Sequence, residues 1–249
     1  MVHRNMMQNK KACVVIPTYN EAENIKSLLE KLEAAFTNVS EYDIHIVVAD
    51  DTSPDGTGDI VKEVAQKYKN VHLLLGEREG MGAAYVRAFS HILDSYDVVI
   101  TMDADFSHPP EMIPDFLTKI DSGCDMVIGS RYIKGGGAPD WPLKRRLISY
   151  FANVVARTVA GLYTVHDCTS NYRAYRTSVL RKIPLQRLSN KGYAFVTTCL
   201  WEVYRQNTRV CEIPLVFYDR KKGETKLGRS DITEFFYNCF RLRLRSLKV

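Results

Sequence analysis

Residues 97–110, DVVITMDADFSHPP, pass from an apolar run through two aspartates to two prolines. The β-branched run up to Thr101 is typical of a buried strand, because strands buried on both faces have nearly continuous apolar sequences. The prolines are typical of the start of a helix, since proline has no amide hydrogen to donate to a continuing strand. The sequence therefore predicts a strand, an acidic turn at Asp103 and Asp105, and then a helix.

The same alternation of strand and helix extends on both sides of this stretch. Short β-branched runs predict strands at residues 13–16, 44–49, 71–75, 97–102 and 125–128. Apolar residues at helical spacing predict the helices between them, at 21–36, 60–68, 82–93 and 110–120. The second half is less regular, with helices expected at 143–162, 192–204 and 231–247 and a strand at 210–217. This order predicts a single α/β domain with a mostly parallel sheet flanked by helices.

The bulk composition limits the class of protein. A chain of 249 residues with 45% apolar content can bury one sizeable core, and its net charge of +5 suits anionic ligands or an anionic membrane surface. No nucleic acid partner is expected, because the chain has no strongly basic tail. We expect no secretory signal, because the first residues lack an apolar core, and no apolar run is long enough to cross a bilayer. The six cysteines lack metal-site spacing and lie mostly in apolar runs, so we expect free thiols in a reducing, cytoplasmic compartment.

Acidic residues collect where the predicted strands end. Asp50, Asp51 and Asp55 follow the second strand, and Asp103 and Asp105 follow the fourth. Ligands of parallel α/β sheets bind at this carboxyl edge. An Asp-x-Asp pair on a continued strand directs both carboxylates to one side, which suits a hard cation such as Mg²⁺ or Mn²⁺. So many negative charges would repel one another unless a cation joined them.

The chain also holds basic residues suited to phosphate, at Arg131, Arg145, Arg220 and Lys226. Carboxylates, a metal and separate cationic side chains together indicate a site for a nucleoside diphosphate. A dinucleotide oxidoreductase is a poor fit, because the first strand is followed by PTYNEAEN without the required glycines. The chain has no GxxxxGK[ST] motif either.

Several motifs together resemble those of the dolichyl-phosphate (polyprenyl-phosphate) mannosyltransferases, which are family 2 inverting glycosyltransferases with the GT-A fold. They are PTYNE at 17–21, DDTSPDGT at 50–57, DAD at 103–105, GSRY at 129–132, DCTSNYR at 167–173 and FYDRKKGETKLG at 217–228. The resemblance implies a GT-A domain at 12–230, followed by a basic amphipathic helix at 231–249. It also implies metal-dependent, inverting transfer of mannose from GDP-mannose to a dolichyl or polyprenyl phosphate.

The resemblance further implies roles for single residues. The guanosine would be held at the first two strand ends, by Pro17, Tyr19, Glu21, Val48 and Asp50. The diphosphate would lie on Asp103, Ala104 and Asp105, with Asp105 the principal metal ligand and Asp103 supporting it. The donor would also be bound by Arg220 and Lys226, and the lipid phosphate by Arg131, Arg145 and Ser149. Those that act directly in catalysis would be Asp105, Arg131, Arg220 and Lys226.

The implied reaction agrees with the absence of a clear general base in the sequence. A lipid phosphate is already an anion at neutral pH, so it can attack the sugar without losing a proton. The implied location is the cytoplasmic face of a membrane, and some relatives use small membrane-anchoring subunits. The last helix, with Phe235, Phe236 and Phe240 among arginines, either lies on the membrane surface or packs on the domain.

Three alternatives stay open. A different prenyl-phosphate glycosyltransferase would use another donor, such as UDP-glucose. An aspartyl-phosphate phosphotransferase would form a covalent phosphoenzyme on Asp103. A non-catalytic sugar-nucleotide binding module would bind the donor without turnover. His108, beside two prolines, is expected to have a structural role.

Overall fold

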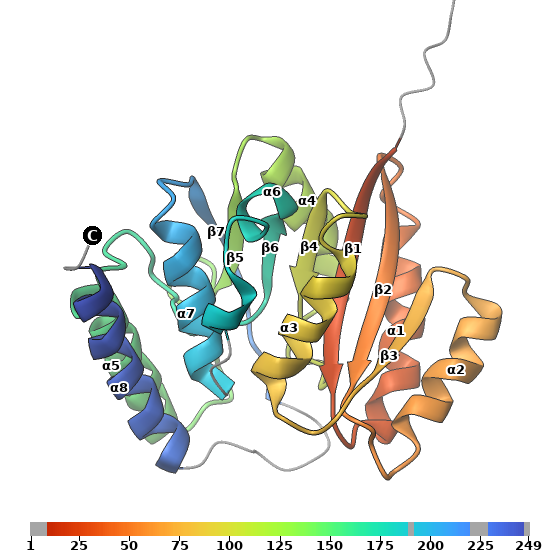
Figure 1. Ribbon diagram of the computed structural model, residues 1–249, viewed down its shortest axis with the longest axis horizontal. Coiled ribbons are helices and arrows are strands. Elements are labelled where there is room, and N and C mark those ends of the chain that lie inside the picture. Colours follow the sequence, from red (N-terminus) through yellow and green to blue (C-terminus); the bar gives the residue numbers. More distant parts are fainter. Residues whose placement is uncertain (1–8, 189–191, 220–228, 247–249) are drawn as a thin grey trace, which may run out of the picture.

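The computed structural model of the protein describes residues 9–188, 192–219 and 229–246. Its centre is a seven-stranded sheet of order β3-β2-β1-β4-β6-β5-β7 (Figure 1). The strands are β1 (Lys10–Thr18), β2 (Tyr42–Asp50), β3 (Val71–Leu75), β4 (Val98–Thr101), β5 (Met126–Ser130), β6 (Arg173–Arg176) and β7 (Val210–Pro214). Every pairing between neighbours is parallel except the two that β6 makes, with β4 and with β5. The predicted, mostly parallel sheet is confirmed.

Helices cover both faces of this sheet. They are α1 (Ala22–Phe36), α2 (Thr57–Lys67), α3 (Met81–Ile92), α4 (Ile113–Asp121), α5 (Leu143–Thr158), α6 (Thr177–Leu180), α7 (Gly192–Tyr204) and α8 (Arg229–Ser246), with short 3-10 turns η1 (Pro110–Met112) and η2 (Leu185–Leu188). In β1, Val14 and Ile16 join the core under α1, α2 and α4, whereas Cys13 and Val15 join the core under α3 and α7. This division follows from the alternation of side chains along a strand.

The pair of helices α5 and α8 stands at one end of the molecule, where the two lie side by side beyond α7 (Figure 1). Helix α5 ends at Thr158 and β7 ends at Pro214, both earlier than expected. None of the helices in the described parts of the chain is long and apolar enough to cross a membrane.

Strand β6 was not predicted, because its sequence, RAYR, contains two arginines and no β-branched residue. It runs antiparallel between β4 and β5, with Arg173 opposite both Thr101 and Ile128. The start of β6 therefore lies near the carboxyl ends of its two neighbours. This reversal brings the preceding segment, residues 167–172, to the acidic edge of the sheet.

The expectation of free cysteines is wrong for two of the six. Cys124 and Cys211 form a disulfide, with their Cα atoms 6.1 Å apart. The parallel pairing of β5 with β7 places Cys211 opposite Val127, close to Cys124, which lies two residues before β5. The other four cysteines, Cys13, Cys168, Cys199 and Cys239, are free and buried, as expected.

Candidate active site

The acidic turn after β4 is fixed by several hydrogen bonds. The backbone N–H of Asp103 donates to His108 Nδ1 over 2.9 Å, and Asn171 Nδ2 donates to Asp103 Oδ1 over 2.8 Å. Asp105 Oδ1 accepts the backbone N–H of Ser107 at 3.1 Å and its hydroxyl at 2.6 Å. Phe106 has a φ of 63°, a left-handed conformation that reverses the chain within the turn. The two carboxylates are thus held in a defined arrangement.

His108 supports this turn. Its ring is buried and stacks on Tyr172, with 4.8 Å between ring centroids. Because Nδ1 accepts a backbone N–H, the neutral ring carries its proton on Nε2, which lies 3.9 Å from Asp103 Oδ2. Burial lowers the pKa of His108 below its usual value, against the opposing effect of Asp103 and Asp105. A neutral His108 therefore acts as a structural support of the acidic turn.

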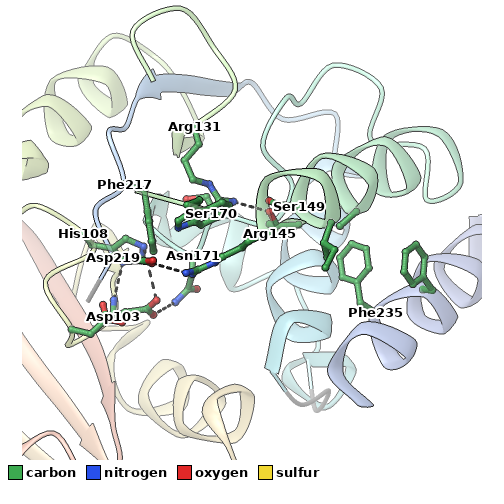
Figure 2. A pocket seen from close by; sticks show the side chains of 16 residues that line it. Asp103, His108, Arg131, Arg145, Ser149, Ser170, Asn171, Phe217, Asp219 and Phe235 are labelled. Atoms are coloured by element: carbon green, nitrogen blue, oxygen red, sulfur yellow. Dashed lines mark hydrogen bonds and ion pairs between the residues drawn. The ribbon is translucent and has the colours of Figure 1, made fainter. Parts of the chain in front are cut away.

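A pocket of about 140 Å³ opens beside the turn and brings five of the predicted residues together. These five are Asp103, Asp105, Arg131, Arg145 and Ser149. Figure 2 shows Asp103 and His108 near one end of the pocket and Phe235 near the other, with Asn171 and Arg145 between them. The end formed by α5 and α8 is apolar and is lined by Ile148, Ala152, Phe235 and Phe236. The pocket thus joins an acidic corner, a basic middle and an apolar end.

Arg131, which follows β5, is held by Asp167. Its Nε and Nη2 each donate to the Asp167 carboxylate over 2.7 Å, and Nη2 also donates to Thr169 Oγ1 over 2.7 Å. Asp167 is 0% exposed and accepts backbone N–H groups of Arg131, Thr169 and Ser170 as well. Burial alone would raise the pKa of Asp167, but the charge and hydrogen bonds of Arg131 lower it below its usual value. The result is a buried, fully ionised pair.

Arg145 lies in the first turns of α5 and has a different environment. Its Nη1 donates to Asp219 Oδ1 over 2.5 Å, and its guanidinium lies 4.3 Å from the centre of the Trp141 ring. Ser149, one turn further along α5, accepts a hydrogen bond from the hydroxyl of Tyr132 over 2.8 Å. Trp141 is buried and packs against Phe217, so its ring is held in place beside Arg145.

The predicted guanosine residues form a separate group at the ends of β1 and β2. Asp50 is buried and its carboxylate accepts hydrogen bonds from Thr18 and from the hydroxyl and N–H of Ser53. Arg78 lies 3.8 Å from the centre of the Tyr19 ring and donates to the Tyr19 hydroxyl over 3.0 Å. Pro17 and Glu21 are partly buried and Val48 is fully buried. Ala104 is also buried, and Arg220 and Lys226 lie outside the described residues.

The acidic corner has the chemistry of a metal site. Within residues 9–188, 192–219 and 229–246, no cluster of three or more histidine, cysteine or acidic side chains has metal-binding geometry. Mg²⁺ is usually held by only one or two protein carboxylates together with phosphates of its substrate. Asp103, whose side chain is 35% exposed, and Asp105 both line the pocket. Two carboxylates that line a pocket therefore suit a cation whose remaining ligands come from a diphosphate.

Two site residues, Asp167 and Asn171, were not predicted individually. Both belong to DCTSNYR, which the sequence indicated only as a motif of the family. Asp167 holds Arg131, and Asn171 holds Asp103. Their segment therefore connects the acidic corner to the basic middle of the pocket.

Comparison with known proteins agrees with the motifs. Residues 13–184 match the family model described as glycosyl transferase family 2. The chain is 39% identical over 231 residues to a polyprenol monophosphomannose synthase of Mycolicibacterium smegmatis, with 92% of this chain and 85% of that protein covered. It is 39% identical to an undecaprenyl-phosphate mannosyltransferase of Micrococcus luteus, with 91% of each covered. It is 35% identical to a dolichol-phosphate mannosyltransferase of Pyrococcus furiosus, covering 93% of this chain and 63% of that protein.

Solved structures share the fold at low sequence identity. Glucosyl-3-phosphoglycerate synthase of Mycobacterium tuberculosis, in complex with Mn²⁺, UDP and glucosyl-3-phosphoglycerate, has a TM-score of 0.67 at 17% identity, with 96% of this chain and 81% of that chain covered. Mannosyl-3-phosphoglycerate synthase of Rubrobacter xylanophilus has a TM-score of 0.66 at 18% identity, with 96% and 74% covered. These likenesses confirm the GT-A type of fold. The match over residues 13–184 and the relatives of 39% identity show that the chain belongs to glycosyl transferase family 2.

Proposed function

We propose that the protein transfers mannose from GDP-mannose to a dolichyl or polyprenyl phosphate, with inversion at the anomeric carbon. The observation that carries this proposal is the order of groups along the pocket (Figure 2). Two carboxylates lie at one end, two arginines in the middle and apolar side chains at the other end. A lipid phosphate has a charged head, which suits the arginines, and an apolar chain, which suits the apolar end. The names of the similar mannosyltransferases, which include polyprenol, undecaprenyl-phosphate and dolichol-phosphate, support the same substrates.

The donor would lie across the carboxyl edge of the sheet. Its guanosine would contact Pro17, Tyr19, Glu21, Val48 and Asp50. Its diphosphate would lie on Asp103, Ala104 and Asp105, with Arg220 and Lys226 as further ligands. Asp105 is proposed as the principal ligand of Mg²⁺ or Mn²⁺, with Asp103 supporting it. When bound, the cation would stabilise negative charge on the departing diphosphate.

The acceptor phosphate would bind between the two arginines. Arg131 and Arg145 place positive charge in the pocket that also holds Asp103 and Asp105. Bringing a phosphate anion toward an anionic diphosphate is unfavourable unless such cations offset the repulsion. Because the acceptor oxygen is already ionised, direct attack requires no proton removal, and a neutral His108 is consistent with this. Ser149 would add a hydroxyl to the phosphate site.

The lipid chain would leave the pocket between α5 and α8. The apolar end of the pocket lies between these helices, and both expose large apolar side chains nearby, including Leu147 and Phe151 on α5 and Tyr237 and Phe240 on α8. We therefore propose peripheral association with the cytoplasmic face of a membrane, with small anchoring subunits as further partners. The catalytic domain would comprise residues 12–230, and residues 231–249 would be the membrane-associated helix.

A radiochemical assay tests the proposal. Purified protein would be given labelled GDP-mannose, Mg²⁺ or Mn²⁺ and one of several prenyl phosphates. Labelled lipid that is cleaved by mild acid is the expected product, and its absence with every acceptor would refute the proposed function. Parallel assays with labelled UDP-glucose would detect the alternative donor. A covalent phosphoenzyme on Asp103 would indicate the phosphotransferase instead.

A further inference from the structure

The ion pair between Arg145 and Asp219 occupies the pocket itself. Arg145 Nη1 lies 2.5 Å from Asp219 Oδ1, and both residues line the pocket that contains Asp103 and Arg131. Their side chains are 31% and 37% exposed, so solvent reaches the pair. Asp219 comes from the segment after β7, and Arg145 comes from α5. The pair therefore links two elements across the proposed acceptor site.

This pair differs from the other pair in the pocket. Asp167 is 0% exposed and accepts two hydrogen bonds from the Arg131 guanidinium, together with three backbone N–H groups. A buried pair of this kind is costly to separate. Asp219 accepts one hydrogen bond from Arg145 near solvent, and exposed pairs of this kind contribute little to stability. Of the two pairs, the Arg145–Asp219 pair is therefore the one that a ligand can readily break.

The ligand that can displace Asp219 from Arg145 is a phosphate. Carboxylates and phosphates bind a guanidinium through the same oxygen geometry, so they compete for the same N–H donors. Trp141 lies against one face of the Arg145 guanidinium and keeps it in the pocket whichever anion it binds. We propose that Asp219 takes the place of the acceptor phosphate on Arg145, and that the phosphate must displace it. Asp219 thereby sets the affinity for the prenyl phosphate. The inference rests on the proposed function, since it concerns the same acceptor.

The central test is the variant Asp219→Asn, which keeps the shape of the side chain and removes its charge. In the wild type, only molecules in which Arg145 is not paired with Asp219 can bind the phosphate. The apparent Kd is therefore the intrinsic Kd divided by the fraction of such molecules. We expect the variant to bind farnesyl phosphate about fivefold more tightly, a change equivalent to about 1 kcal/mol and at the upper end for exposed pairs. The KM for the acceptor should fall in the same proportion, and the KM for GDP-mannose should not change.

A matched control and a double variant isolate the contact. Asp140 is exposed, lies one residue before Trp141 and makes no ion pair within the described residues, so Asp140→Asn removes the same charge from the same region. It should leave the Kd for farnesyl phosphate unchanged. In an Arg145→Gln background, Asp219→Asn should have no further effect, because the competition requires the guanidinium.

Calorimetry with farnesyl phosphate, and with inorganic phosphate as a second probe, gives a readout without turnover. An unchanged or weaker affinity in Asp219→Asn would overturn the inference, as would an equal gain in Asp140→Asn. A weaker affinity would show that Asp219 only positions Arg145. Failure of the wild-type protein to bind or use any prenyl phosphate would instead contradict the proposed function. Melting temperatures of the variants would verify that each protein is folded.

Discussion

The Arg131 guanidinium and the Asp167 carboxylate form a buried pair joined by two hydrogen bonds of 2.7 Å. The same carboxylate accepts the backbone N–H groups of Thr169 and Ser170, so it also determines the conformation of its own turn. Asn171, at the end of that turn, donates to Asp103. The position of the acidic corner relative to the basic middle of the pocket therefore depends on Asp167.

Replacement of Asp167 by asparagine should destabilise the fold strongly. The variant would leave the Arg131 charge buried without a counter-ion, and breaking a buried pair typically costs about 3–5 kcal/mol. Urea denaturation would measure the free energy of unfolding. The control is Asp94→Asn. The Asp94 side chain is 99% exposed and lies 3.5 Å from Arg181, so loss of its charge should change stability by less than about 1 kcal/mol. Similar losses in both variants would contradict the structural role of Asp167.

The Asp167 pair also predicts how stability depends on pH. The pKa of Asp167 is lower in the folded protein than its usual value, so the folded state binds this proton less readily than the unfolded chain. The stabilisation is therefore complete above the unfolded pKa of about 4, and it is lost as the pH falls through the lower folded value. The difference in unfolding free energy between wild type and Asp167→Asn should shrink in acid. A difference that stayed constant from neutral pH to well below the unfolded pKa would exclude this ionisation as its source.

The acidic corner should depend on Asn171 as well as on its own carboxylates. Asn171 Nδ2 donates to Asp103 Oδ1 and to the hydroxyl of Tyr85, each over 2.8 Å. In Asn171→Ala the Asp103 carboxylate loses a donor, and we expect a fall in kcat of about tenfold or more, as for other groups that orient metal ligands. Binding of Mn²⁺, followed by electron paramagnetic resonance, should weaken too. The control Tyr85→Phe keeps the ring and the Asp103 contact, so it should bind Mn²⁺ nearly normally.

Asp105 itself should be indispensable for turnover. Its carboxylate lines the pocket and is the proposed principal metal ligand, so Asp105→Ala should lower kcat by a factor of about 10³ or more, as when a transition-state stabilising group is removed. The melting temperature should change little by comparison. Asp59→Asn is a fair control, because Asp59 lies on the surface of α2 and pairs only with Lys62 in the described structure. Near-normal rates in Asp105→Ala would refute the metal assignment.

The sequence predicted those features that depend on local patterns. The apolar runs of β2 and β4 and the acidic residues after them could be recognised without a structure, because each acidic residue lies within a few residues of the strand that it follows. The roles of Asp167 and Asn171 could not, since they depend on β6 running antiparallel between β4 and β5. The disulfide between Cys124 and Cys211 was missed for the same kind of reason. It depends on two strands that pair across 87 residues of sequence.

The exposed face of α8 should bind membranes. Tyr237, Phe240 and Leu244 are exposed and recur at i, i+3 and i+7, so they form one stripe along the helix. Arg241 and Arg243 are exposed beside them, and a basic, apolar surface of this kind suits an anionic lipid headgroup region. Helix α5 adds Leu143 and Phe151 to the same end of the molecule.

Sedimentation with phosphatidylglycerol-containing vesicles would measure this binding. The double variant Tyr237→Ser, Phe240→Ser should bind at least about tenfold more weakly, because each aromatic side chain loses apolar area buried in the headgroup region. Leu75→Ser, which removes an exposed apolar side chain from β3 at the far end of the sheet, should bind as wild type. Binding of the wild type should also weaken as salt screens the arginines. Equal losses in the two variants would mean that binding reflects general surface hydrophobicity, and the stripe on α8 would then have no special role.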